Sequence, residues 1–182
     1  MFAKSLKKKF ISNFPSVRQV YDYDCGARCL QTVFAYYGID VRGDKMMKLL
    51  GTSKSGTSFS KMEKVAKQYG IRVELRKMTI LKIKKFIAKK IPVILLLQAY
   101  VGKKKVNWDK SWKYGHYVMA IGYDSKKIFF EDPESIFTTY LSFSELEKRW
   151  HDISGGKKYV YYGMALYGKP LASHKNKIIK LP

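Results

Sequence analysis

The sequence predicts a single domain of the α+β class, in which helices come first and strands follow. Helical patterns dominate the first half of the 182-residue chain and strand patterns dominate the second half. Hydrophobic residues make up 46% of the chain, which is enough to bury a core and excludes intrinsic disorder for most of it. We expect the domain to span residues 17–169, between basic tails at residues 1–16 and 170–182.

The helices are predicted from apolar periodicity and from residues that typically begin or end a helix. The predicted helices cover residues 25–37, 44–50, 59–69 and 79–90. The first is apolar almost all round and stops before Gly38, which indicates a buried central helix. Thr57 or Ser58 can cap the third helix, and Thr79 can begin the fourth.

The second half is expected to supply most of the strands. The predicted strands cover residues 71–75, 92–97, 116–123, 128–132 and 159–167. Residues 99–114 form a long loop, and Ser144-x-x-Glu147 predicts a capping box that opens a last short helix. The double glycine at 155–156 is interpreted as a hairpin turn rather than a site of self-cleavage.

The charge is strongly positive, with 36 Lys and Arg against 14 Asp and Glu, a net +22. The lysines are spread along the whole chain and no nucleic-acid-binding motif stands out, so a solvated surface is the simplest interpretation. A field of this size also suits an anionic partner: an acidic peptide, nucleic acid or an anionic surface. No apolar run reaches the about 18–20 residues of a membrane span, and no secretory signal is evident, so we expect a cytoplasmic protein.

The candidate chemistry begins with Gln19-Val-Tyr-Asp-Tyr-Asp-Cys25, which runs straight into the predicted central helix. Cys25 would lie in the first helical turn, where free N–H groups and the helix dipole favour the nucleophilic thiolate. The Gln19 amide and the Cys25 N–H would form an oxyanion hole. Asp24 is expected to cap the helix, and Gly26 to let another backbone approach closely.

A second group of residues lies in the hairpin predicted over residues 116–132. His116 begins its first strand and Asp132 ends its second, and both the turn signal and their midpoint fall at Asp124. The two side chains would then face each other directly, and Asp132 would orient the His116 ring. A two-residue turn at 125–126 would instead place Asp132 on the opposite face.

Several neighbouring residues are candidates for substrate binding or for packing. Gly115 is expected to leave room for a substrate backbone, while Trp112 and Tyr114 either line the cleft or pin the long loop. Cys29 is expected to pack in the core. No metal or cofactor is expected, because the spacing of the cysteines and histidines matches no common zinc pattern.

Taken in order, these motifs resemble the bacteriocin-processing, double-glycine cysteine peptidases, a papain-like family. The resemblance covers about residues 17–143 and rests on the segments 19–30, 36–38, 56–58, 91–93, 115–118 and 132–133. It implies a papain-like fold, with the active-site helix packed on an antiparallel sheet and with Cys25, His116 and Asp132 as a catalytic triad. It also implies that Gln19 belongs to the oxyanion hole and that cleavage follows a small residue, such as the Gly-Gly of a leader peptide.

Two other functions fit parts of the same pattern. A thiol acyltransferase or amidase would use the same acyl-enzyme intermediate as a peptidase. A non-catalytic basic protein would bind nucleic acid or an anionic surface and would not need the triad. The family is best known as the N-terminal domain of peptide-exporting transporters. The sequence shows no membrane or ATPase part, so we expect a free-standing relative of that family.

Overall fold

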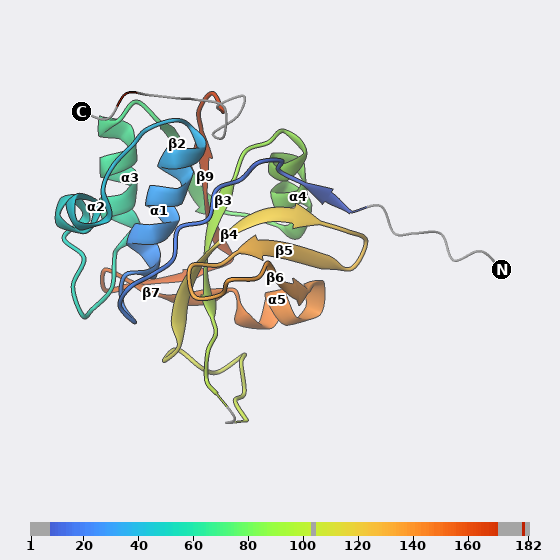
Figure 1. Ribbon diagram of the computed structural model, residues 1–182. Coiled ribbons are helices and arrows are strands. Elements are labelled where there is room, and N and C mark those ends of the chain that lie inside the picture. The colour runs from blue at the N-terminus through green and yellow to red at the C-terminus, as the bar shows by residue number, and fades with distance from the viewer. Residues whose placement is uncertain (1–7, 103–104, 171–179, 181–182) are drawn as a thin grey trace.

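A buried helix packed against a seven-stranded antiparallel sheet forms the centre of the protein. The computed structural model describes residues 8–102, 105–170 and 180 (Figure 1). The helices are α1 (Cys25–Tyr36), α2 (Gly43–Leu50), α3 (Phe59–Gln68), α4 (Ile80–Ala88) and α5 (Phe143–Arg149). None of these described helices is long and apolar enough to cross a membrane.

The strands of the large sheet run in the order β2-β9-β3-β4-β5-β6, with β1 paired to β4. They are β1 (Lys9–Phe10), β2 (Arg72–Lys77), β3 (Val93–Gln98), β4 (Gly115–Tyr123), β5 (Lys127–Glu131), β6 (Thr139–Ser142) and β9 (Tyr162–Tyr167). A separate two-stranded ribbon contains β7 (His151–Ser154) and β8 (Lys157–Val160). The α+β class predicted from the sequence is therefore confirmed, with α1 to α3 gathered on one side in Figure 1.

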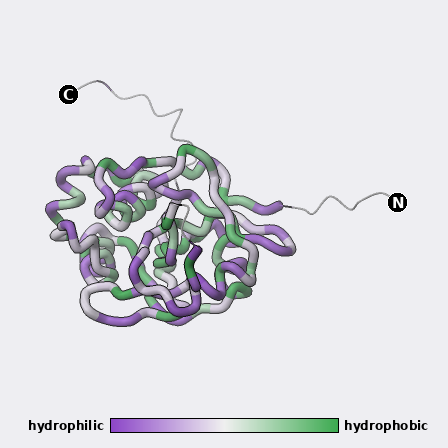
Figure 2. Tube along the Cα trace, turned by 90° about the horizontal axis from the view of Figure 1, so that it is seen from below, coloured by the Kyte–Doolittle hydropathy of each residue, from purple (hydrophilic) through white to green (hydrophobic). Residues whose placement is uncertain are grey.

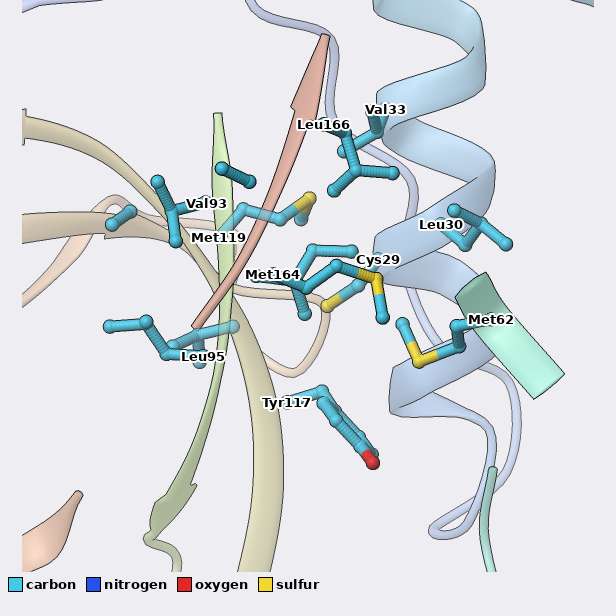
Figure 3. Close-up of a cluster of buried hydrophobic side chains, with 14 of the residues drawn as sticks. Cys29, Leu30, Val33, Met62, Val93, Leu95, Tyr117, Met119, Met164 and Leu166 are labelled. Carbon is cyan, nitrogen blue, oxygen red and sulfur yellow. The ribbon is translucent and has the colours of Figure 1, made fainter. Parts of the chain in front are cut away.

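The core lies between α1 and the centre of the sheet. Cys29, Leu30 and Val33 of α1 are fully buried and belong to one apolar cluster with Met119 of β4 and Leu166 of β9 (Figure 3). Burial on nearly every side explains why α1 lacks the polar face of a surface helix. Cys29 thus packs in the core as predicted, and burial raises its pKa well above the ordinary range, which makes it an inert thiol.

The predicted N-terminal boundary at residue 17 is wrong, because the preceding residues join the sheet. Phe10 pairs with Gly122 of β4, and the buried Ile11 donates its N–H to the carbonyl of Ile121 (2.8 Å). Two strand residues are too few for a periodic signal, so β1 could not be predicted. Most of the two predicted tails, residues 1–7, 171–179 and 181–182, lies outside the described residues.

Two details near the C-terminal end also differ from expectation. The capping box is formed by Ser142 and Glu145 rather than by Ser144 and Glu147, because α5 begins directly where β6 ends. The predicted last strand is divided into β8 and β9 at Tyr161, which has a φ of 60°. The hairpin turn at the double glycine is confirmed, with positive φ at both residues.

Hydrophilic residues recur along the whole tube rather than gathering in one segment (Figure 2). This matches the even spread of lysines along the chain. The positive charge therefore does not by itself point to one functional surface.

Candidate active site

The hairpin of β4 and β5 does not have the predicted register. Tyr123 pairs with Ile128, and Asp124 donates its N–H to the carbonyl of Lys127 (3.1 Å), so the turn has two residues, 125 and 126. If this register continued unbroken, Asp132 would lie opposite Met119. His116 would then be on the other face of the sheet.

A β-bulge on β4 brings the two side chains back to the same face. The register shifts by one residue between Ala120 and Gly122, so that Met119 pairs with Glu131. The next residue, Asp132, then lies beside Val118 and shares a face with His116. The predicted direct opposition is wrong, and the observed contact is diagonal across the hairpin.

His116 and Asp132 form a buried hydrogen bond. The Nε2 atom of His116 lies 2.8 Å from Oδ1 of Asp132, and both residues are buried. Asp132 also accepts hydrogen bonds from Tyr100 Oη (2.7 Å), Thr139 Oγ1 (3.2 Å) and the N–H of Glu134 (3.0 Å). Burial alone would raise the pKa of Asp132, but these donors and the His116 charge lower it, so the carboxyl is ionised at neutral pH.

Cys25 is the first residue of α1 and lies beside His116. Because Nε2 of His116 is bonded to Asp132, Nδ1 is the nitrogen left for the Cys25 thiol. Burial lowers the pKa of His116, but the hydrogen bonds and charges of Asp132 and Cys25 outweigh it and raise this pKa to about 9. The arrangement therefore favours an imidazolium next to the sulfur, which is what a nucleophilic thiolate requires.

Two adjoining hollows flank the Cys25–His116 pair. The Cys25 pocket, of about 340 Å³, is lined among others by Cys25, Thr57, Trp112, Gly115, Asp152 and Gly155. The His116 pocket, of about 270 Å³, is lined among others by Gln19, Tyr100, Tyr114, Gly115, His116 and Glu134. Since both pockets include Gly115, an extended chain laid across them would pass the sulfur.

Gln19 lies on the His116 side of this groove. Its backbone N–H donates to the carbonyl of Pro133 (3.0 Å), which ties the segment before α1 to the segment after β5. Its side-chain Oε1 is buried and has no hydrogen-bond partner among the described residues. The acceptor end of the amide is thus held at the site without being used by the described part of the fold.

Asp24 does not cap α1, which corrects the prediction. Its carboxylate is fully buried and accepts the N–H groups of Val20 and Tyr21, which precede it. It also forms an ion pair with Arg28, with Nη2 and Nε both 2.8 Å from Oδ2. The pair fixes the loop that joins Gln19 to Cys25 and neutralises the charge beside the sulfur.

The two glycines predicted to leave space have that space filled by the protein itself. A Cβ at Gly26 would lie 2.9 Å from atoms of Thr57 and Tyr117, and one at Gly115 would lie 1.5 Å from Oδ2 of Asp152. The lack of a Cβ at both glycines is therefore used for close packing within the protein, while Gly115 also borders both pockets, and its role in substrate binding stays a prediction. Burial raises the pKa of Asp152, which the sequence analysis did not single out.

The aromatic residues before His116 both line the groove and pin the loop. Trp112 lies in the Cys25 pocket with its ring 4.6 Å from that of His151, and Tyr114 lines the His116 pocket. Gln98, at the end of β3, accepts from the N–H of Tyr114 (3.1 Å) and donates to the carbonyl of His151 (3.2 Å). Gln98 is a polar residue at the end of a wholly apolar strand, and this was a usable signal in the sequence that it holds the loop. Nothing in the sequence indicated that Tyr100 contacts the site.

Among the residues that the structure describes, no group of three or more His, Cys, Asp or Glu side chains is placed to hold a metal ion.

A cysteine at the start of a buried helix, facing a histidine and an aspartate from an antiparallel sheet, is the arrangement of papain-like cysteine peptidases. The chain belongs to the Peptidase C39 family, whose model matches residues 13–154. This confirms the resemblance seen in the sequence. No curated protein matches the chain.

Solved structures share the fold at low sequence identity. The peptidase domain of Streptococcus ComA, a bi-functional ABC transporter involved in quorum sensing, has a TM-score of 0.66 at 19% identity, over 86% of this chain and 99% of that one. A C39-like peptidase from Bacillus anthracis has a TM-score of 0.69 at 17% identity, over 91% and 100%. A double glycine motif protease from an AMS/PCAT transporter, in complex with the leader peptide, has a TM-score of 0.60 at 21% identity, over 86% and 91%.

Proposed function

We propose that this protein is a cysteine peptidase that uses Cys25 as nucleophile, His116 as general base and acid, and Asp132 to orient His116. The observation that carries the proposal is the buried His116–Asp132 hydrogen bond beside the first residue of α1, in a chain of the C39 family. The raised pKa of His116 supports the same assignment, since it favours the charged pair at neutral pH.

The chemical steps follow from these positions. His116 takes the proton of Cys25, and the thiolate attacks the peptide carbonyl, whose oxygen becomes an anion held by the Cys25 N–H and the Gln19 amide. His116 then donates the proton to the departing amine, which leaves an acyl group on the sulfur. Water, deprotonated by His116, hydrolyses this thioester and restores the free thiol.

The substrate we propose is a peptide cut after a small residue, such as the double glycine that ends a leader. Support comes from the structural relative that is a double glycine motif protease bound to a leader peptide. The net charge of +22 would speed the encounter with an acidic leader, an effect that salt would screen.

The first test is the rate of alkylation by iodoacetamide as a function of pH, followed by intact mass. We expect one labelled site, Cys25, with rapid labelling well below the ~8.5 pKa of a free thiol. His116→Ala should slow labelling at pH 6 by at least about tenfold. In this variant the labelling rate should begin to rise only at about pH 8.5. Cys25→Ala is the matched control, because the remaining thiol of Cys29 is fully buried.

Slow labelling of the wild type that is unchanged in His116→Ala would contradict the proposal. Where labelling is rapid, peptides containing Gly-Gly then test the reaction itself. Release of the segment after Gly-Gly, absent with Cys25→Ala, is the expected result. Transfer of the acyl group to an added amine, without hydrolysis, would indicate an acyltransferase instead.

A further inference from the structure

A tyrosine from the long loop between β3 and β4 contacts both members of the His116–Asp132 pair. The Oη atom of Tyr100 donates to Oδ2 of Asp132 at 2.7 Å. The Tyr100 ring meets the His116 ring edge-on, with centroids 4.9 Å apart and planes at 83°. A single side chain therefore binds the carboxylate and covers the imidazole.

The two oxygens of Asp132 have separate partners. Oδ1 accepts from His116 and from the N–H of Glu134, whereas Oδ2 accepts from Tyr100 and from Thr139. The donors on Oδ2 fix the rotation of the carboxylate and so hold Oδ1 toward His116. Tyr100 makes the shorter of these two bonds, 2.7 Å against 3.2 Å for Thr139.

The backbone at Tyr100 is held in an unfavourable conformation. Its φ is 59°, in the left-handed region that a residue with a Cβ seldom adopts. The surrounding loop imposes this conformation at its base, where Ala99 donates its N–H to the carbonyl of Tyr114 (2.8 Å) and Tyr114 donates to Gln98. Strain that the fold maintains at the rim of a site is typical of a functional position.

Cover by the ring also changes the electrostatics of the pair. His116 is only 6% exposed although Tyr100 itself is 53% exposed, so the ring stands between the imidazole and water. A hydrogen bond between charged groups is stronger when water is excluded. Burial and the bond to Asp132 raise the pKa of Tyr100, so its hydroxyl remains a donor throughout the working pH range.

We infer that Tyr100 is a positioning residue for the reaction proposed above. Its hydroxyl fixes the Asp132 carboxylate, and its ring shields the His116–Asp132 hydrogen bond. This inference rests on the proposed function, because a positioning role has meaning only if His116 acts on Cys25.

The test compares Tyr100→Phe, which removes only the hydroxyl, with Tyr100→Ala, which also removes the cover. Tyr100→Phe should lower kcat by about 3- to 10-fold with little change in KM, since one hydrogen bond to the carboxylate that orients His116 is lost. Tyr100→Ala should lower kcat by about 100-fold. It should also move the alkaline limit of kcat/KM away from about pH 9, because losing the cover changes both the burial that lowers the His116 pKa and the bond to Asp132 that raises it.

Tyr140→Phe is the matched control, because Tyr140 is also 53% exposed and its ring packs against Phe129. It should retain wild-type rates. The inference is overturned if both Tyr100 variants behave like Tyr140→Phe, or if Tyr100→Ala lowers the melting temperature while its alkaline limit stays at the wild-type value. Alkylation of wild-type Cys25 that does not depend on His116 would instead refute the proposed function, and the inference with it.

Discussion

Replacing Asp132 by alanine is expected to lower kcat/KM at pH 7 by about 10²- to 10³-fold. The reason is that Asp132 holds Nε2 of His116 at 2.8 Å and thereby leaves Nδ1 for the Cys25 sulfur. Without the carboxylate, the imidazole can rotate and is no longer stabilised as imidazolium. Measurement of kcat/KM on a Gly-Gly peptide gives the loss, and circular dichroism establishes that the variant is folded.

Asp132→Asn separates the charge of this residue from its geometry. The amide oxygen can still accept from His116, so we expect a loss of only about tenfold at pH 7. The negative charge of Asp132 is one cause of the raised His116 pKa, and the imidazolium therefore persists up to about pH 9 in the wild type. Without that charge, His116 loses its proton at a lower pH, and the alkaline limit of activity moves down toward about 6.5.

Glu131→Gln is the matched control for both variants, because Glu131 is the adjacent residue and pairs with Met119 instead. It should keep the wild-type alkaline limit. If Asp132→Ala and Asp132→Asn also keep both the rate and the alkaline limit of the wild type, Asp132 does not act on His116.

The parts of the fold that the sequence predicts are those governed by local signals. Apolar periodicity and a following glycine place α1 within a residue of its observed end at Tyr36, and Ser58 and Thr79 cap α3 and α4 as expected. Short motifs of a few neighbouring residues likewise led us to predict that Cys25, His116, Asp132 and Gln19 lie in one region.

The register between β4 and β5 shows what local signals leave out. In the sequence Val118-Met-Ala-Ile-Gly122, only the glycine indicates a bulge, and it was interpreted as part of the turn, yet the bulge decides on which face Asp132 lies. The carbonyl of Ile121, inside the bulge, accepts the N–H of Ile11, so the bulged strand is braced by β1. A contact between residues more than a hundred positions apart cannot be inferred from the pattern of either segment.

The loop over residues 99–114 is a second case. Its composition predicts a loop, but the position of Tyr100 depends on contacts of Gln98 with the loop and with β7. Such a position follows from the assembled structure and not from spacing along the chain. The sequence therefore allowed us to predict that Cys25, His116 and Asp132 lie in one region, but not which residues hold them there.

Asp24, next to the candidate site, is a residue whose local interpretation from the sequence was incorrect. An aspartate directly before a helix is compatible both with capping and with binding the N–H groups that precede it. Arg28, four residues later on the same face, favours the second by pairing with the carboxylate. The absence of a Cβ at Gly43 is part of this arrangement, since a Cβ there would lie 1.8 Å from Nη1 of Arg28.

This buried pair leads to the largest expected effect on stability. Arg28→Met is expected to lower the free energy of unfolding by about 3–5 kcal/mol, because it leaves the Asp24 carboxylate buried without its cation. The double variant Asp24→Asn with Arg28→Met should recover part of this loss, since no charge is then buried and the amide oxygen can still accept from Val20 and Tyr21. Urea unfolding, with the midpoint and slope fitted together, measures both values.

The exposed pair of Arg42 and Asp44 supplies the control, with side chains 84% and 70% exposed. Arg42→Met should leave the urea midpoint close to its wild-type value, because an exposed ion pair contributes little to stability. If Arg28→Met costs as little as Arg42→Met, the Asp24–Arg28 pair does not support the fold. Because that pair holds the loop between Gln19 and Cys25, we also expect Arg28→Met to slow alkylation of Cys25 at temperatures where the protein is still folded. A loss of stability without slower alkylation would separate the role of the pair in the fold from its role at the site.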